Sequence, residues 1–245
     1  MIIPQRFNGP PDTGNGGYTS GMLAGRLAPG TAPGAVEVTL HAPPPLEVEL
    51  ATVVEPDSVA LRHGDALIAT ATPARLESDP VPPVTYQQAT EISHEYPGFV
   101  AHPFPTCYTC GPNRSDGLRL FPGRLPDGRT AAPFLVPEDA EPATVWAALD
   151  CPGGWAISVE PPHDRDQAPH HRDQVKGPIG IEARPYVLGR ITAQVDDTPK
   201  PGSRCVVTGQ LLSSQGRKAV VATTVWGPDG RALATARATW IALTG

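Results

Sequence analysis

The stretch that decides the fold occurs twice, first as Gly64-Asp-Ala-Leu-Ile-Ala-Thr-Ala-Thr72 and again as Gly230-Arg-Ala-Leu-Ala-Thr-Ala-Arg-Ala238. Each copy is a glycine turn followed by small and β-prone residues, a pattern that predicts a strand entered through a tight turn. Each copy also closes its half of the chain. The repeat therefore indicates that one structural unit is used twice.

Around each copy, the expected elements follow the same order: an opening strand, one helix and about four strands. In the first half they are expected at residues 4–7, 16–27 (the helix), 35–41, 46–54, 58–61 and 66–73. In the second half they are expected at residues 118–121, 130–136, 142–149 (the helix), 186–195, 203–212, 218–226 and 232–242. One helix per sheet cannot wind a parallel βαβ layer. Each half is therefore expected to be a curved antiparallel sheet wrapped around one central helix.

The expected boundaries place one unit at residues 1–78 and a second at 106–245. Residues 79–105 contain many prolines and show no clear period, so they are expected to be a linker with one short helix at 86–94. The polar stretch 160–177 is expected to be a loop or lid. The chain is thus expected to have two tandem units and to belong to the α+β class.

Composition sets limits on what the protein does. At roughly 150 residues per domain, 245 residues correspond to between one and two domains. The 19 basic and 25 acidic residues give a net charge of −6, which argues against a nucleic-acid-binding surface. No apolar run approaches the about 18 residues of a membrane helix, and no signal peptide is evident, so a cytoplasmic protein is expected.

Two motifs in the second half resemble a known family. The segment Cys107-Tyr-Thr-Cys-Gly-Pro-Asn-Arg-Ser-Asp-Gly-Leu118 resembles the opening C-F-x-C-G-P-D-N-P-x-G-L of small hotdog thioesterases of the phenylacetate-degradation type. Downstream, Leu149-Asp-Cys-Pro-Gly-Gly-Trp-Ala156 resembles their L-D-E-A-M-G-W-A. With two such units, the chain resembles the double-hotdog acyl-CoA thioesterases. The resemblance implies two tandem hotdog domains, each a curved antiparallel sheet around one helix.

In that family, an H-G-G motif begins the central helix and a carboxylate follows nine residues after its histidine. Free amides at a helix N-terminus can polarise a thioester carbonyl and stabilise the oxyanion that develops. The carboxylate attacks the carbonyl or activates water. In family dimers, the amide donor and the carboxylate of one site come from facing helices.

The first half keeps only the amide part of this motif. Asn15-Gly16-Gly17 resembles H-G-G, but Ala24 stands at the carboxylate position and has no acid-base group. The resemblance implies that Gly16 supplies the oxyanion donor and that Asn15 and Gly17 shape the helix start. The alternative is that Asn15 merely caps a helix beside a glycine turn.

The second half keeps only the carboxylate. Asp150 stands at the family position, whereas Glu141 precedes Pro142, which has no N–H to donate. If the two helices face each other, one composite site combines Gly16 with Asp150, and the opposite pair, Pro142 with Ala24, is inactive. A hydrogen-bonded structural carboxylate is the alternative for Asp150, and Pro152 is expected to end or bend the helix.

Cysteines pose a separate question. Cys107, Cys110, Cys151 and Cys205 are expected to be thiols rather than disulfides in a cytoplasmic protein. Cys107 and Cys110 have the spacing of half a zinc knuckle, but no second CxxC pair exists and a structural zinc needs about four ligands. His102 and Cys151 could join them, although their spacing does not require it. Packed thiols are the preferred interpretation, and no metal site is expected.

The leading functional hypothesis is hydrolysis of an acyl-CoA or acyl-carrier-protein thioester at the composite site, without a metal or redox cofactor. Asp150 and Gly16 would be catalytic, and Asn15, Gly17 and Trp155 would contact the substrate. A non-catalytic acyl-thioester-binding protein and a hotdog hydratase or dehydratase are the alternatives. By analogy with the family, a homodimer or a higher even-numbered oligomer is expected, with no nucleic-acid or membrane partner.

Overall fold

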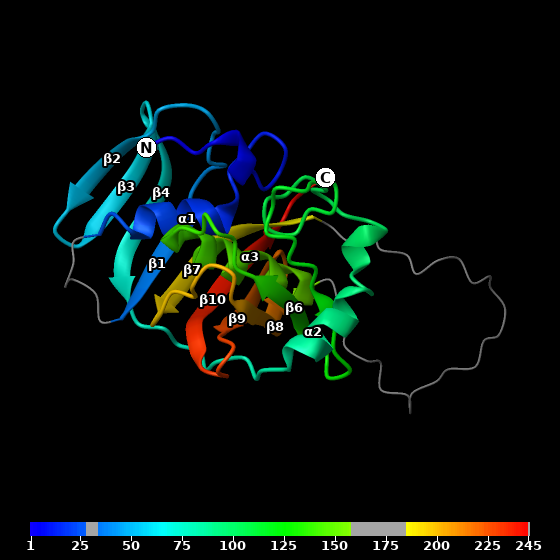
Figure 1. The fold of residues 1–245 in the computed structure, drawn as a ribbon. Helices are drawn as coiled ribbons and strands as arrows, with labels where there is room; N and C mark the ends of the chain where they lie inside the picture. Colours follow the sequence, from blue (N-terminus) through cyan, green and yellow to red (C-terminus); the bar gives the residue numbers. More distant parts are fainter. Residues whose placement is uncertain (28–33, 158–184, 245) are drawn as a thin grey trace.

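The structure is a computed structural model that describes residues 1–27, 34–157 and 185–244. The expected loop or lid at 160–177 lies outside these residues. All ten strands of the described residues belong to one antiparallel sheet, in the order β2-β3-β4-β1-β7-β10-β9-β8-β6-β5 (Figure 1). No helix of the described residues is long and apolar enough to cross a membrane.

Each half contributes one central helix and a block of neighbouring strands. The first half supplies α1 (Gly16–Ala24), β1 (Ala35–Leu40), β2 (Ala51–Glu55), β3 (Ser58–His63) and β4 (Ala66–Ala74). The second half supplies β5 (Gly123–Arg124), β6 (Thr130–Leu135), α3 (Pro142–Ile157), β7 (Tyr186–Val195), β8 (Arg204–Gln215), β9 (Lys218–Trp226) and β10 (Ala232–Ala242). The repeated stretches form β4 and β10, which lie one on each side of the β1–β7 pair.

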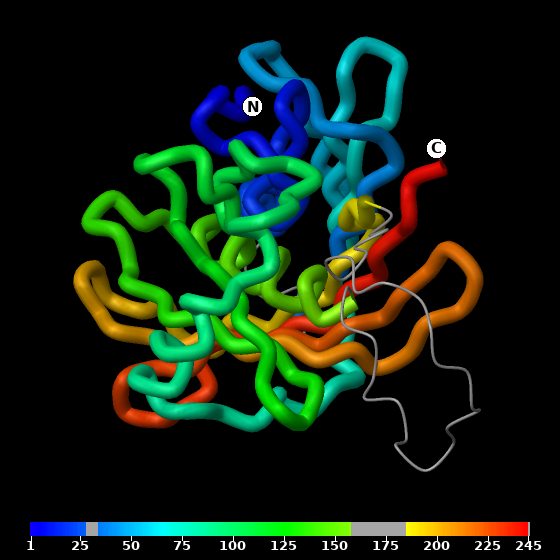
Figure 2. The backbone as a smooth tube through the Cα atoms, turned by 90° about the vertical axis from the view of Figure 1, so that its right-hand side faces the viewer, coloured from blue at the N-terminus to red at the C-terminus, as the bar shows by residue number. Residues whose placement is uncertain are grey.

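The two blocks of strands are joined edge to edge. β1 pairs antiparallel with β7, and Val38 stands opposite Ile191 in the register. Both side chains are fully buried, so the junction is part of the core rather than a solvent-filled seam. The strands curve around the side on which α1 and α3 lie (Figure 2).

The prediction of an opening strand is wrong in both halves. Residues Gln5–Phe7 form a short 3-10 helix, and residues 118–121 have no regular structure. Arg119 has a φ of 53°, in the left-handed region that a strand does not use. The strand expected at 46–54 begins only at Ala51, because Glu47 also has a positive φ, of 57°.

Pro152 does not end α3, the central helix of the second half. α3 continues through it to Ile157, and the turn that follows Asp150 packs closely on the sheet. The carbonyl of Pro152 accepts a hydrogen bond of 2.8 Å from the Thr130 hydroxyl of β6. A Cβ atom at Gly153 would lie 2.5 Å from Thr223 Oγ1 of β9. The hydrogen bond from Thr130 holds this turn against β6, and the close approach to β9 leaves no room for a side chain at Gly153.

The proline-rich segment 79–105 packs on the sheet along part of its length. Its helix α2 (Tyr86–Ser93) begins with a capping box made by Thr85 and Gln88. Val81 is tied to the sheet because its carbonyl accepts hydrogen bonds of 3.1 Å from the Thr208 hydroxyl and 3.0 Å from the Trp226 indole. Alternate residues of β6 and β8 therefore face α2 on one side of the sheet and α3 on the other.

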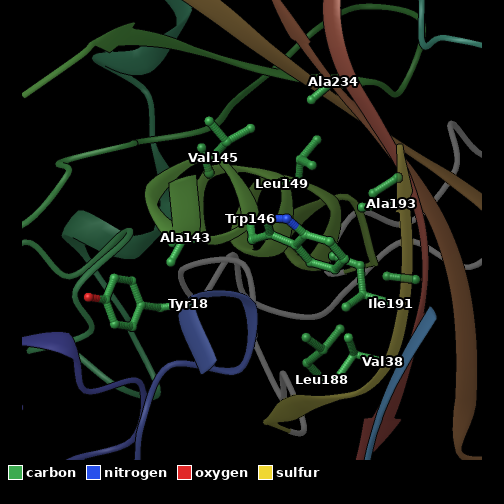
Figure 3. Packing of buried hydrophobic residues seen from close by; sticks show 14 of the residues in the cluster. Tyr18, Val38, Ala143, Val145, Trp146, Leu149, Leu188, Ile191, Ala193 and Ala234 are labelled. Carbon is green, nitrogen blue, oxygen red and sulfur yellow. The ribbon is translucent and has the colours of Figure 1, made fainter. Parts of the chain in front are cut away.

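The main hydrophobic core lies between the two central helices and the concave side of the sheet. Figure 3 shows Trp146 and Leu149 of α3 beside the strands that carry Ile191, Ala193 and Ala234. Leu149, Ile191 and Ala234 have no exposed surface. This packing holds α3 at a fixed distance from the sheet.

α1 and α3 run antiparallel and approach so closely that two glycines of α1 are required. A Cβ at Gly17 would lie 2.5 Å from the carbonyl oxygen of Trp146, and one at Gly21 would lie 2.7 Å from the Cα of Ala143. Such separations are shorter than any van der Waals contact. The start of α1 is therefore held against the middle of α3, where Asp150 lies.

Gly21→Ala is predicted to lower the free energy of unfolding by about 1–3 kcal/mol, because the methyl group overpacks the crossing of α1 and α3. The matched control is Gly25→Ala at the end of the same helix. Gly25 has a φ of −65°, and a Cβ there would meet nothing closer than 3.5 Å. The control is expected to be neutral or slightly stabilising. Urea unfolding of both variants measures the difference, and equal stabilities would contradict the close crossing.

Candidate active site

A cavity of about 530 Å³ opens where the start of α1 meets α3. Its walls are mostly apolar and include Leu40, Phe104, Trp155, Leu188 and Ile241. Polar groups of Asn15, Gly16 and Asp150 also line it. A pocket of this size, with apolar walls and a few convergent polar groups, is typical of a small-molecule site.

Asn15 links the two helices at the floor of this cavity. It is the N-cap of α1, and its Oδ1 accepts a hydrogen bond of 2.8 Å from the amide of Tyr18. Its Nδ2 donates to Asp150 Oδ2 at 3.3 Å. The side chain therefore satisfies one free amide of α1 and, with its other end, one oxygen of a buried carboxyl group.

Asp150 receives a second donor from the backbone of α1. The amide of Gly17 lies 3.0 Å from Asp150 Oδ2. Asp150 is only 3 % exposed, and its other oxygen, Oδ1, has no hydrogen-bond partner within the described part of the chain. One oxygen of the carboxyl group is thus held by α1, and the other is buried without a hydrogen-bond partner among the described residues.

The environment makes this carboxyl group unusually basic. Burial raises the pKa of Asp150 from 3.8 to about 7, with a smaller upward effect of Cys107. The amide of Gly17 and the side chain of Asn15 lower the pKa, since both donate to the charged form. A carboxyl group of this kind exchanges its proton near neutral pH, which is what a general base or acid requires.

The backbone amides of Gly16 and Gly17 differ in their hydrogen bonding. The Gly17 amide is used by Asp150, and the Tyr18 amide by Asn15. The Gly16 amide, the first of α1, has no hydrogen-bond partner among the described residues, and Gly16 lines the cavity. A free amide at a helix N-terminus is suited to an anion or a polarised carbonyl oxygen.

The opposite pair of positions forms no comparable site. Pro142 begins α3, beside the end of α1, and neither Pro142 nor Ala24 lines the cavity. Glu141 instead accepts a hydrogen bond of 3.4 Å from the Tyr18 hydroxyl. Within the described part of the chain, the Gly16 amide and the Asp150 carboxyl group therefore lie at one cavity, and the positions of Pro142 and Ala24 lie outside it.

The remaining sequence candidate, Trp155, lies on the cavity wall and packs edge-on against Tyr96 at 4.7 Å. Two histidines also line the cavity: His41, which the sequence analysis did not single out, and His102, which it named only as a possible zinc ligand. His102 is half-buried and sits 3.3 Å from Cys110 Sγ. Neither histidine contacts Asp150 in the structure.

No protein-family profile matches the chain, and no curated protein matches it in sequence. Solved structures do match the chain, by their fold. A Novosphingobium aromaticivorans protein named among the thioesterases matches with a TM-score of 0.59 and 14 % identity, over 100 % of this chain and 94 % of its own. The tesB protein of Mycobacterium avium subsp. paratuberculosis matches with a TM-score of 0.56 and 13 % identity, over 100 % and 91 %.

A third structure, an Alicyclobacillus acidocaldarius protein of unknown function described as having a hot dog fold, matches with a TM-score of 0.53 and 13 % identity. The match covers 95 % of this chain and 88 % of the Alicyclobacillus chain. The chain therefore has the hotdog fold, in which a curved antiparallel sheet encloses central helices. The fold resembles that of proteins named thioesterases, and the expectation of a hotdog fold is confirmed.

Asn15→Ala is predicted to lower the free energy of unfolding by about 0.5–2 kcal/mol, since it removes the cap of α1. Asn15→Ser keeps a capping oxygen but cannot reach Asp150 with an amide nitrogen, so most of the stability should return. Denaturant unfolding of the two variants tests the cap. An equal loss in both would show that Asn15 stabilises the fold by another route.

Proposed function

We propose that this protein hydrolyses an acyl thioester, of coenzyme A or of an acyl carrier protein, in the cavity between α1 and α3. Two tandem hotdog units, at residues 1–78 and 106–245, would each supply one component of the site. The observation that carries the proposal is the meeting of a free helix-start amide, Gly16, with a buried carboxyl group, Asp150, in one apolar cavity.

In this proposal, the thioester carbonyl oxygen accepts a hydrogen bond from the Gly16 amide. The partial positive charge at the start of α1 favours the negative charge that this oxygen gains in the transition state. Asp150 acts from the other side through Oδ1, as the base that deprotonates water or as the nucleophile. The contacts from Gly17 and Asn15 to Oδ2 orient the carboxyl group for either role.

The cavity walls suit the acyl part of such a substrate. Leu188 and Ile241 come from β7 and β10, and Trp155 comes from the last turns of α3. Burying an acyl chain against these side chains contributes about 0.8 kcal/mol for each methylene group. Substrates with too few carbon atoms to reach this wall are expected to react less efficiently.

Binding without hydrolysis is the second candidate. The contacts of Gly17 and Asn15 to Asp150 also serve a purely structural purpose, because they compensate a buried carboxyl group. In that case the cavity would hold an acyl thioester and leave it intact. The two candidates differ in one observable, the release of the free thiol.

Association into dimers belongs to the same proposal. β2 lies at one edge of the sheet and leaves Val53 and Val54 44 % and 58 % exposed. An exposed apolar edge strand offers unpaired backbone groups to a second chain. A homodimer or a higher even-numbered oligomer formed by the tandem units would cover this edge.

Asp150→Asn is predicted to lower the turnover of acyl-CoA hydrolysis by about 100-fold or more, because the amide cannot act as a base or a nucleophile. Release of free thiol is measured on short, medium, long and aryl acyl-CoAs and on acyl carrier proteins. Glu141→Gln removes a carboxylate outside the cavity and is the matched control, expected to react like wild type. A wild type that binds these thioesters but releases no thiol supports binding alone. Asp150→Asn at the wild-type rate contradicts the composite site.

A further inference from the structure

Three of the four cysteines gather at one point beside the cavity. The sulfur atoms of Cys107, Cys110 and Cys151 all lie within 4.8 Å of one another, and all three residues are buried. The Cys107 and Cys151 sulfurs are 3.8 Å apart, although 44 residues separate them in the sequence. Cys107 and Cys110 belong to the CxxC loop, and Cys151 belongs to α3.

This spacing fits a tetrahedral metal site. Zinc binds cysteine sulfur at about 2.3 Å. Two sulfurs at tetrahedral positions around one zinc ion are then about 3.8 Å apart, by simple geometry from that bond length. The Cys107–Cys151 separation of 3.8 Å has this value. A disulfide needs about 2.05 Å between its sulfurs, so the three residues are thiols here.

The CxxC loop is held rigidly at the distance that the cluster requires. The amide of Gly111 donates to the Cys107 carbonyl at 2.9 Å, and a Cβ at Gly111 would lie 2.5 Å from the Cys107 nitrogen. Only glycine therefore fits after the second cysteine. The Thr109 hydroxyl donates to the Ala147 carbonyl of α3 at 3.2 Å, which ties the loop to the helix that carries Cys151.

Hydrogen-bond donors surround two of the sulfur atoms. Asn15 Nδ2 donates to the Cys107 sulfur at 3.8 Å. On the Cys110 sulfur, the neighbouring side-chain nitrogen is Nε2 of His102, at 3.3 Å. Neutral thiols packed as small apolar groups need no such donors. Donors directed at sulfur are the outer partners that metal-bound thiolates use.

His102 is one of these donors rather than a fourth ligand. Its Nδ1 accepts a hydrogen bond of 2.9 Å from the Phe104 amide. A neutral imidazole carries a single proton, so that proton is on Nε2, which points at the Cys110 sulfur at 3.3 Å.

We propose that Cys107, Cys110 and Cys151 bind one Zn²⁺ ion as thiolates, with a water molecule from the cavity as the fourth ligand. All three cysteines line the cavity, and His102 supports Cys110 through its N–H. Soft thiolate ligands in a tetrahedral arrangement select zinc over magnesium or calcium. The ion would lock the CxxC loop onto α3 next to Asp150. The assignment rests on the sulfur geometry and is independent of the proposed hydrolysis.

The first test is the metal content of the full chain, purified under reducing conditions without added chelator. One zinc per chain by mass spectrometry is expected. Cys107→Ser, Cys110→Ser and Cys151→Ser should each lower zinc affinity by at least tenfold. Cys205→Ser is the matched control, because Cys205 is a buried thiol on β8 that is not part of the cluster. It should bind zinc like wild type. A reduced wild type that takes up no added zinc overturns the proposal.

The second test counts the ligands on the wild-type chain and does not depend on how the variants fold. X-ray absorption at the zinc edge should show three sulfur neighbours and one nitrogen or oxygen neighbour. His102→Ala should weaken binding but keep this pattern. A zinc ion with only two sulfur neighbours in wild type would overturn the three-cysteine assignment. A His102→Ala variant that binds no zinc would overturn it as well. Removing the ion with a chelator should lower the melting temperature of wild type and of Cys205→Ser, but not of Cys151→Ser.

Discussion

Gly17 places its backbone directly against α3, so near to Trp146 and Asp150 that no side chain fits between the helices. This contact fixes the position of the other parts of the site. Because α1 and α3 touch there, the Gly17 amide and the Asn15 side chain reach the Asp150 carboxyl group. The same approach leaves the Gly16 amide at the wall of an apolar cavity. Without the crossing, Asp150 would be a buried charge with no donors, a costly arrangement.

The crossing also explains how two incomplete halves give one complete cavity. The helices run antiparallel, so the start of α1 meets the middle of α3, while the start of α3 meets the end of α1, near Gly21. Pro142 and Ala24 stand in the second of these regions and provide neither an amide donor nor a carboxylate. The continuous pairing of β1 with β7 holds both helices on one curved sheet. The shared sheet thereby fixes the relative positions of groups that come from different halves.

The sequence predicted the central helices and the regular strands well, because glycine turns and alternating residues identify them locally. It failed at the opening strands, since Glu47 and Arg119 adopt positive φ values that only tertiary contacts impose. The site candidates Asn15, Gly17 and Asp150 lie together, and their selection depended on the resemblance to a family rather than on periodicity. The sequence offered Cys151 as a possible partner of Cys107 and Cys110 but could not establish the cluster, because Cys151 reaches Cys107 only through the orientation of α3.

The central claim is that one cavity combines an amide of α1 with the carboxyl group of α3 around a thioester carbonyl. The most direct measurement is a crystal structure with an acyl-CoA analogue in which a methylene group replaces the thioester sulfur, leaving the carbonyl in place. The account predicts that its carbonyl oxygen lies at hydrogen-bond distance from the Gly16 nitrogen, with Asp150 Oδ1 close to the carbonyl carbon or to a water beside it. An analogue whose carbonyl lies near Pro142, or whose acyl chain lies outside the cavity, would contradict the account.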